Sequence, residues 1–359
     1  MQIITKFKKH HAFLLFPLAL LYWGVVVWRN FFYRYNFFLK RRLPCKVISV
    51  GNITLGGTGK TPIVLYLCSL LVKQGNKVSI LSRGYGRRTK GTVLVSSGNG
   101  PLCKWEETGD EPFMLAKRLK GIPIVVDEDR FRGGIFLVKN YNPDIIIMDD
   151  GFQHRSLLRD LDIVILNGND KRADYKLLPY GKLREPWINI KRADVLLITK
   201  KVPDPFLKRK ALETKLPCFQ TKISAKVFKI KNNLETSLKQ LMNIKVLLLS
   251  GIGDSEHFKH TAIYLGCRVR GVEAYPDHFK FTNKEVLIAE KKANEVGADY
   301  IMTTEKDWVK LRNFNLSFPI AVIEIGIRVV DEARLLHLIQ RKLYSKSAPF
   351  PKQRQLQQM

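Results

Sequence analysis

A glycine-rich stretch between residues 50 and 62 constrains the fold of this chain more than any other feature. It reads Val50-Gly-Asn-Ile-Thr-Leu-Gly-Gly-Thr-Gly-Lys-Thr-Pro62. The apolar run 46–50 before it predicts a strand, and the apolar run 63–72 after it predicts a helix. The order of strand, glycine-rich loop, Gly59-Lys60-Thr61 and helix is typical of a phosphate-binding loop (P-loop), which predicts an α/β fold and a nucleotide ligand.

Each part of this loop has an expected contact with phosphate. Glycines allow backbone N–H groups to turn toward phosphate oxygens, and the helix N-terminus adds partial positive charge. We expect Lys60 to reach the β- and γ-phosphates of ATP, and the Thr61 hydroxyl to bind Mg²⁺. The usual pattern has glycine where this chain has Thr54, so the later glycines supply the freedom. The expected ATP-binding residues are Thr54, Leu55, Gly56, Gly57, Thr58, Gly59, Lys60 and Thr61.

The charge balance predicts an anionic partner. The chain has 61 Lys and Arg against 32 Asp and Glu, a formal net charge of +29. Such a field favours nucleic acid, acidic lipid headgroups or phosphorylated substrates. The excess is uneven, because residues 1–42 and the chain after Glu332 contain basic residues and no acid.

Residues Ala12 to Trp28 form an uncharged and mostly apolar segment. As a helix it would be about 26 Å long, slightly short of a bilayer core of about 30 Å. Aromatic and basic residues then alternate as far as Arg42, which is typical of a membrane–water interface. Three alternatives stay open: a helix lying in one leaflet, a single span, and a signal peptide or soluble packing helix. No small-residue cleavage site follows, which disfavours the signal peptide.

The expected side of the membrane is the cytoplasmic one. A nucleotide site belongs in the cytosol, where ATP is found. The five basic residues from Arg29 to Arg42 would keep the rest of the chain on that side. The five cysteines are scattered without C-x-x-C spacing, as is typical of free thiols in a reducing compartment.

Short apolar strands alternate with helical runs through most of the chain. This alternation predicts a parallel sheet covered by helices on both faces. Residues 217–241 differ, because 226–231 alternates in polarity and Asn232-Asn233 predicts a turn. The expected parts are a membrane-associated segment 1–42, a nucleotide-binding domain 43–220, a two-stranded linker 221–242, a second and smaller α/β lobe 243–345 and a disordered tail 346–359.

Two adjacent carboxylates, Asp149 and Asp150, follow the apolar run 144–148. P-loop enzymes place a metal-binding carboxylate at the C-terminal end of a buried strand. Acids also follow strands as helix caps, but a pair followed by Gly151-Phe-Gln-His154 favours a metal site. We expect Asp149 and Asp150 to bind Mg²⁺ directly or through water.

Seven motifs together resemble those of a known family. They are Asn52 to Pro62, Ser82-Arg-Gly-Tyr-Gly86, Gly109-Asp-Glu-Pro112, Asp149-Asp-Gly-Phe-Gln-His154, Leu178-Pro179 with Leu183-Arg-Glu-Pro186, Asp277-His-Phe279 and Thr304-Glu-Lys-Asp307. In this order, over residues 44–310, they resemble the tetraacyldisaccharide 4′-kinases, also called lipid A 4′-kinases. The resemblance implies a P-loop α/β/α sandwich, a second and smaller α/β lobe and an N-terminal membrane-associated helix.

The resemblance also implies an activity and a set of site residues. The γ-phosphate of ATP would move to the 4′-hydroxyl of a tetraacyldisaccharide 1-phosphate, giving lipid IVA at the cytoplasmic face of the inner membrane. The partners would be this anionic glycolipid and the membrane surface, and no nucleic acid. The implied residues are Asp110 as base, His278 as its partner, Lys60 as a catalytic cation, Arg184 for an anion and Glu185 for metal or ribose.

Taken alone, several of these motifs have plainer interpretations. Gly109-Asp-Glu-Pro112 is typical of a helix start with Asp110 as its cap, and Asp277-His278 is typical of a polar loop. No role is assigned to Arg83, His154 or the segment 304–307.

Two other classes of protein are weighed against the kinase. One is a transport or assembly ATPase without a lipid acceptor, from which Asp110 and His278 distinguish a kinase. The other is a non-enzymatic binder of nucleic acid or anionic membrane. It rests on net charge alone, and the intact Gly59-Lys60-Thr61 argues against it.

Overall fold

The computed structural model describes residues 15–199, 203–231, 234–237 and 241–344. Residues 1–14, the expected turn at 232–233 and the expected tail 346–359 lie outside this set. The N-terminal half contains α2 (Phe16–Arg34), β1 (Lys46–Asn52), α3 (Lys60–Lys73), β2 (Val78–Ser82), β3 (Val93–Ser96), α4 (Trp105–Thr108), α5 (Asp110–Arg118), β4 (Ile124–Val126), α6 (Arg130–Tyr141), β5 (Ile145–Asp149), β6 (Leu161–Asn167), η2 (Arg172–Tyr175), η3 (Trp187–Arg192), β7 (Val195–Thr199) and α7 (Pro205–Glu213).

The C-terminal half continues the alternation of strands and helices. It contains β8 (Cys218–Lys231), β9 (Leu234–Ser237), β10 (Lys245–Ser250), α8 (Ser255–Tyr264), β11 (Arg268–Ala274), α9 (Asn283–Glu295), β12 (Tyr300–Thr304), α10 (Glu305–Leu311), β13 (Ile320–Val329) and α11 (Glu332–Tyr344). Within the described residues, the strands join into one sheet in the order β11-β10-β12-β13-β8-β7-β6-β1-β5-β2-β4-β3, with β9 beside β8.

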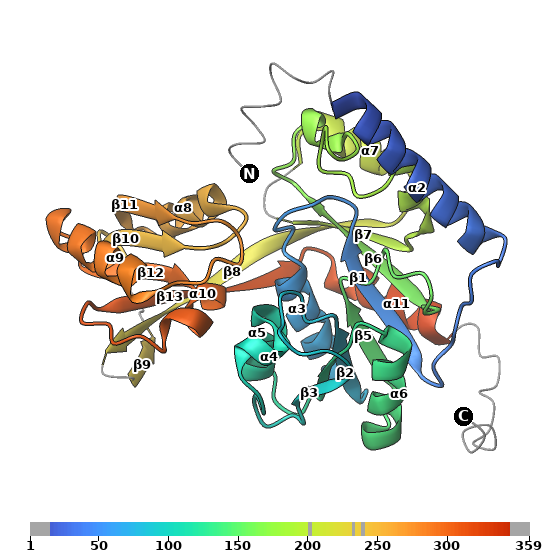
Figure 1. Ribbon diagram of the computed structural model, residues 1–359, viewed down its shortest axis with the longest axis horizontal. Coiled ribbons are helices and arrows are strands. Elements are labelled where there is room, and N and C mark those ends of the chain that lie inside the picture. Colours follow the sequence, from blue (N-terminus) through green and yellow to red (C-terminus); the bar gives the residue numbers. More distant parts are fainter. Residues whose placement is uncertain (1–14, 200–202, 232–233, 238–240, 345–359) are drawn as a thin grey trace.

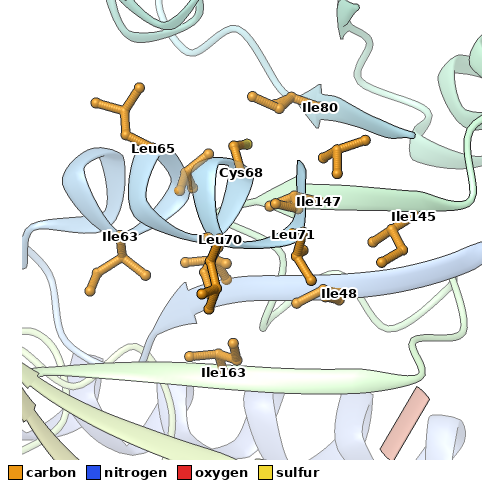
Figure 2. Close-up of a cluster of buried hydrophobic side chains, with 14 of the residues drawn as sticks. Ile48, Ile63, Leu65, Cys68, Leu70, Leu71, Ile80, Ile145, Ile147 and Ile163 are labelled. Carbon is orange, nitrogen blue, oxygen red and sulfur yellow. The ribbon is translucent and has the colours of Figure 1, made fainter. Parts of the chain in front are cut away.

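Strands β1 to β7 with their helices form what we call the first lobe, an α/β/α sandwich. Its central strands run parallel and are buried on both faces, which explains their continuous apolar sequences. Ile48 and Val50 of β1 pack on the face covered by α3, whereas Val47 packs with Leu137 of α6 on the other face. Figure 2 shows side chains of α3 lying over β1, β5 and β6. This packing fixes the helix that follows the glycine-rich loop.

Strands β10 to β13 with α8, α9 and α10 form the second, smaller lobe. Helices α9 and α10 cover one face of its sheet, and α8 covers the other. A ribbon of two strands joins the lobes, as Figure 1 shows. Residues 218–220 of β8 pair with β7, and residues 221–230 pair antiparallel with β13. The expected linker at 221–242 therefore contributes one long strand, whose main partner β13 comes about a hundred residues later in the chain.

Helix α11 differs from the sequence-based expectation that it would belong to the second lobe. Its apolar side chains Leu335, Leu338, Ile339 and Leu343 are buried in the same cluster as α3 and β1. Tyr66 of α3 donates a 2.9 Å hydrogen bond to Glu332 at the start of α11. The reason is topological, because β13 runs back along β8 and delivers the chain to the first lobe.

Helix α2 lies along the outside of the first lobe, close to α7 (Figure 1). Val26 faces inward and is buried, and the Tyr22 hydroxyl donates to the carbonyl oxygen of Arg184. The outer side is apolar and exposed, and forms an open groove of about 850 Å³ lined in part by Leu21 and Trp28. Among the described residues, none of the helices is long and apolar enough to cross a bilayer, as the single-span alternative requires.

Candidate active site

The glycine-rich loop follows β1 and ends where α3 begins at Lys60. Gly59 caps the helix with a φ of 85°, a left-handed conformation that glycine adopts without strain. The Lys60 ammonium lies 3.4 Å from Asp150 Oδ1 and 3.4 Å from Asn52 Oδ1. Asn52 also donates to the Thr58 hydroxyl at 3.1 Å. Contacts within the loop thus hold it together, and its lysine points toward Asp150, directly after β5.

Thr54, the departure from the usual loop pattern, ties the loop to a distant segment. Its hydroxyl donates to Asp170 at 3.3 Å. The backbone of the next residue, Leu55, donates to the carbonyl of Lys182 at 2.7 Å, and Arg184 N–H donates to the carbonyl of Ile53 at 2.9 Å. These contacts place the Arg184-Glu185 segment beside the glycine-rich loop. The Thr54 hydroxyl therefore makes a contact that a glycine at this position could not make.

The two carboxylates expected to bind metal lie at the C-terminal end of β5, which is the strand next to β1. Asp150 has a φ of 50°, and accepts bonds of 3.1 and 3.2 Å from Arg184. A non-glycine residue in this region stores about 1–3 kcal/mol of strain, which is typical of functional sites. Asp149 is buried and accepts from Ser82 at 3.2 Å through Oδ2, whereas its Oδ1 has no described partner.

The state of Asp149 fits a cation site. Burial raises the pKa of this carboxyl, and the charges of Glu111 and Asp150 raise it further against the effect of Lys60, so that it reaches about 7. A cation at its unpartnered oxygen would satisfy the carboxylate. Glu185 is also buried. Its Oε1 accepts from Arg192 at 2.7 Å and from Gln153 at 3.1 Å, and its Oε2 has no described partner.

The described residues of this site do not surround a metal ion with protein ligands alone. Within the described part of the chain, no three His, Cys, Asp or Glu side chains gather closely enough to hold a metal by themselves. Mg²⁺ usually keeps several waters and binds through one or two carboxylates together with substrate phosphates. A buried carboxylate with a free oxygen beside a phosphate-binding loop fits that mode.

Asp110 and His278 lie in contact although 168 residues separate them in the chain. Asp110 is the first residue of α5 in the first lobe, whereas His278 lies between β11 and α9 in the second lobe. His278 Nδ1 is 3.0 Å from Asp110 Oδ2. The other oxygen, Oδ1, accepts from the backbone N–H of Glu111 at 2.9 Å. Gly109, rather than Asp110, occupies the cap position of α5, so the carboxylate is directed at the other lobe.

The loop Ser82-Arg-Gly-Tyr-Gly86 covers this pair from the first-lobe side. The ring of Tyr85 lies 5.2 Å from the ring of His278. Gly109 has a φ of +91°, and a Cβ there would lie 2.9 Å from the carbonyl oxygen of Tyr85. The close approach of these two segments requires glycine at this position. His278 itself has a φ of +61°, so both Asp150 and His278 hold a backbone conformation that is uncommon for residues other than glycine.

The charges around Asp110 keep it ionised. Burial alone would raise the pKa of this carboxyl. The bond from His278 and the charges of His278, Lys306 and Lys310 outweigh burial and hold the pKa well below its usual range. The same bond raises the pKa of His278, while burial and the charge of Lys306 lower it. Asp110 is therefore a carboxylate at neutral pH.

The structure also places residues to which sequence analysis assigned no role. Arg83 is exposed. His154 is half-buried, and its pKa is lowered to about 4 by burial and by nearby arginines, so it is neutral. Arg130 was missed: it is buried at the start of α6, and its Nε has no described partner. Burial lowers the pKa of its guanidinium to about 10, against the charges of Asp149 and Asp150. A cation in the first turn of a helix opposes the helix dipole, and this could have drawn attention to it.

This arrangement defines a P-loop nucleotide-binding protein in which a second lobe completes the contact between a carboxylate and a histidine. Within that class, the chain belongs to the tetraacyldisaccharide-1-P 4′-kinase family, whose family model matches residues 11–344.

Individual relatives agree along almost the whole chain. It is 36% identical over 330 residues to the tetraacyldisaccharide 4′-kinase of Aquifex aeolicus, covering 92% of this chain and 98% of the relative. It is 39% identical over 354 residues to that of Chlorobaculum parvum, covering 92% and 96%. The crystal structure of the "apo" form of LpxK from Aquifex aeolicus in complex with ATP superposes with a TM-score of 0.71 at 33% identity, covering 92% of this chain and 98% of that one.

Proposed function

We propose that this protein is an ATP-dependent kinase that transfers the γ-phosphate of ATP to the 4′-hydroxyl of tetraacyldisaccharide 1-phosphate, giving lipid IVA. The contact between Asp110 and His278 carries the proposal, because it adds an acceptor-side base to a phosphate-binding loop. Family membership supplies the substrate class, since relatives along almost the full length carry the kinase name.

The proposed mechanism divides the work between the lobes. A sugar hydroxyl is a weak nucleophile, and Asp110 would take its proton as the hydroxyl oxygen attacks the γ-phosphorus. Lys60 and the N-terminus of α3 would hold the phosphates in line and neutralise charge on the leaving ADP. Arg184 would leave Asp150 to contact a phosphate oxygen. These roles are supported by the positions of the side chains at the ends of β1 and β5.

Mg²⁺ would be held by Thr61, Asp149 and Asp150 together with the nucleotide, with Glu185 nearby. When bound, it would supply positive charge that offsets the negative charge of the phosphates. The protein residues do the rest: they orient the phosphates, bury the carboxylates and keep the candidate base ionised.

Transfer of radiolabelled phosphate from ATP to purified tetraacyldisaccharide 1-phosphate in mixed micelles tests the proposal. We expect labelled lipid from the wild-type chain when Mg²⁺ is present. ATP hydrolysis without labelled lipid would contradict the kinase and support a P-loop ATPase with another task. Strong DNA binding without any phosphate transfer would support the non-enzymatic alternative.

We further propose that α2 attaches the protein to the cytoplasmic face of the inner membrane. Its outer side is apolar, with Leu21 and Trp28 exposed by 67% and 62%. Its inner side is fixed to the first lobe through Tyr22 and Val26. Basic residues of the segment 29–42 would add attraction to acidic headgroups, each contributing about 1 kcal/mol near the surface.

Replacing Leu21 and Trp28 together by glutamate should release the protein from the membrane. Burial of each side chain in the membrane contributes about 1.5–3 kcal/mol of binding free energy. We therefore expect membrane partitioning to fall by at least about 100-fold. The measurement is sedimentation with vesicles of zwitterionic and anionic phospholipid. Leu287→Glu is the matched control, because Leu287 is 64% exposed on α9 in the other lobe. If the double variant still sediments like the wild type, the attachment surface lies elsewhere. Deleting residues 1–42 should release the protein as the double variant does.

A further inference from the structure

The segment Thr304-Glu-Lys-Asp307 opens α10, and α10 forms the contact between the two lobes. Phe113 and Met114 of α5 pack with Val309 of α10 in a buried cluster. At one end of this contact, Arg118 of α5 pairs with Glu305 at 3.2 Å. Helix α10 therefore faces the helix that carries Asp110.

Two lysines of α10, Lys306 and Lys310, lie one turn apart and approach the Asp110–His278 pair. Four-residue spacing puts both on the same side of the helix. Lysines at this spacing are usually solvated, yet here both side chains are largely buried, at 16% and 3% exposure. Burying an ammonium is costly unless it is paired, so each of these two cations has to be matched by a specific anion.

Lys306 contacts the far side of the imidazole. Its Nζ is 3.2 Å from His278 Nε2, 3.2 Å from Asp277 and 3.4 Å from Glu111. An ammonium has three donors and no acceptor, so the imidazole nitrogen that faces it has to accept. The proton of a neutral His278 then lies on Nδ1, the atom that faces Asp110. Lys306 selects the tautomer that donates to the carboxylate.

Lys310 contacts the carboxylate itself. Its Nζ is 3.3 Å from Asp110 Oδ2 and 3.7 Å from Asp307 Oδ1. Asp307 is held in turn, because its Oδ2 accepts from Gly251 N–H and from the Thr304 hydroxyl, both at 2.9 Å. Asp110 Oδ2 is thus bounded by His278 and Lys310, and Oδ1 has one bond from Glu111 N–H. A carboxylate has about four acceptor positions, so Oδ1 keeps acceptor capacity beyond the bond from Glu111 N–H.

We infer that Lys306 and Lys310 are positioning residues for the catalytic pair: Lys306 fixes His278 as the donor to Asp110, and Lys310 holds the buried Asp110 as an anion in place. The inference rests on the proposed function, because it assigns these lysines a task only if Asp110 is the base. It gives the segment 304–310 a role, and it makes the pair complete only when the lobes are in contact. Both lysines act through Asp110 and His278.

The first test is independent of lipid phosphorylation. In protein labelled with ¹⁵N-histidine, the His278 signals are identified by their loss in His278→Gln. We expect the neutral imidazole to carry its proton on Nδ1. Lys306→Met removes both the donor to Nε2 and its positive charge. The pKa of His278 should therefore rise, so that the imidazole is protonated up to a higher pH than in the wild type. Lys291→Met, with its side chain 81% exposed on α9, should leave these signals unchanged. Unaltered His278 signals in Lys306→Met would overturn the role of Lys306.

The second test is the pH profile of kcat/KM for phosphate transfer. The charged groups that face Asp110 are His278, Lys306 and Lys310, with Glu111 beside it. Asp110 works as a carboxylate, so activity falls as it becomes protonated, which in the wild type should happen only below about pH 5. Loss of a cation in contact raises a carboxyl pKa by about 1–3 units. In Lys310→Met we expect the acid limb to move to higher pH by at least about one unit, and Lys310→Arg should restore it toward the wild-type position.

An acid limb that stays in place in Lys310→Met would overturn the role of Lys310, whatever the absolute rate. If Lys310→Met does not fold, as judged by its thermal unfolding, the histidine signals of Lys306→Met decide the inference alone. A wild-type protein that yields no labelled lipid would instead contradict the proposed function, and the histidine spectrum would still report whether the lysines position the pair.

Discussion

Lys60→Ala should lower kcat/KM for phosphate transfer by roughly 1,000-fold, which corresponds to about 4 kcal/mol of transition-state stabilisation. The lysine lies at the start of α3, where the backbone N–H groups and the helix N-terminus also face a bound phosphate. Its ammonium lies 3.4 Å from both Asp150 and Asn52. Nucleotide binding would transfer that charge to the β- and γ-phosphates, where negative charge redistributes during the reaction.

The fold should survive this substitution, because Asp150 keeps its bonds from Arg184 and the buried side of α3 is unchanged. Initial rates of labelled lipid formation and thermal unfolding would be measured side by side. Lys73→Ala is the control: it removes a lysine from the last turn of the same helix, on an exposed position. Wild-type-like transfer by Lys60→Ala, with an intact fold, would remove the glycine-rich loop from the mechanism.

Asp110→Asn is expected to lower kcat/KM by about 100- to 10,000-fold, the usual contribution of a positioned general base. Asparagine keeps the shape of the side chain and removes the charge that accepts the proton. In the wild type, His278 and the two lysines hold the pKa of this carboxyl below its ordinary range. Protonation of Asp110 should therefore not limit activity between about pH 5 and 8, and the loss in Asp110→Asn should be similar across that range.

His278→Gln tests whether the two residues act as a unit. Residues that act together are non-additive, so the double variant Asp110→Asn, His278→Gln should be about as slow as Asp110→Asn alone. Glu213→Gln serves as the control, because this carboxylate is 61% exposed on α7. Multiplied losses in the double variant would mean that His278 acts independently of Asp110. Full activity in Asp110→Asn would leave a kinase whose base is another group.

The nucleotide half of the site was predictable from local sequence. An apolar strand, a glycine-rich loop and a helix are consecutive, so the residues that meet the phosphates are also neighbours in the chain. The Asp149-Asp150 pair was predictable for a related reason, since the C-terminal ends of parallel strands meet at one edge of a sheet. What local sequence did not reveal is that Thr54 binds Asp170, a contact between segments more than a hundred residues apart.

The acceptor half could be predicted only from the resemblance to a family. Gly109-Asp-Glu-Pro112 is indistinguishable from a helix start, and nothing in the spacing of residues 110 and 278 places them in contact. Lys306 and Lys310 have the pattern of a solvated helix face, and their burial depends on the approach of α5. Helix α11 is amphipathic, which predicts that one side is buried but not on which sheet. The contact between residues 110 and 278, the burial of the two lysines and the position of α11 all depend on how β8 and β13 connect the lobes.

That connection also has a consequence for how the protein is made. The first lobe is discontinuous in sequence, because β13 returns from the second lobe and α11 fills part of the cluster that anchors α3. Domains emerging from the ribosome generally fold as units, beginning with the N-terminal one. Here a nascent chain that has reached residue 220 still lacks Leu335, Leu338, Ile339 and Leu343. The nucleotide-binding lobe comes first in the chain, yet it is among the last parts that can finish folding.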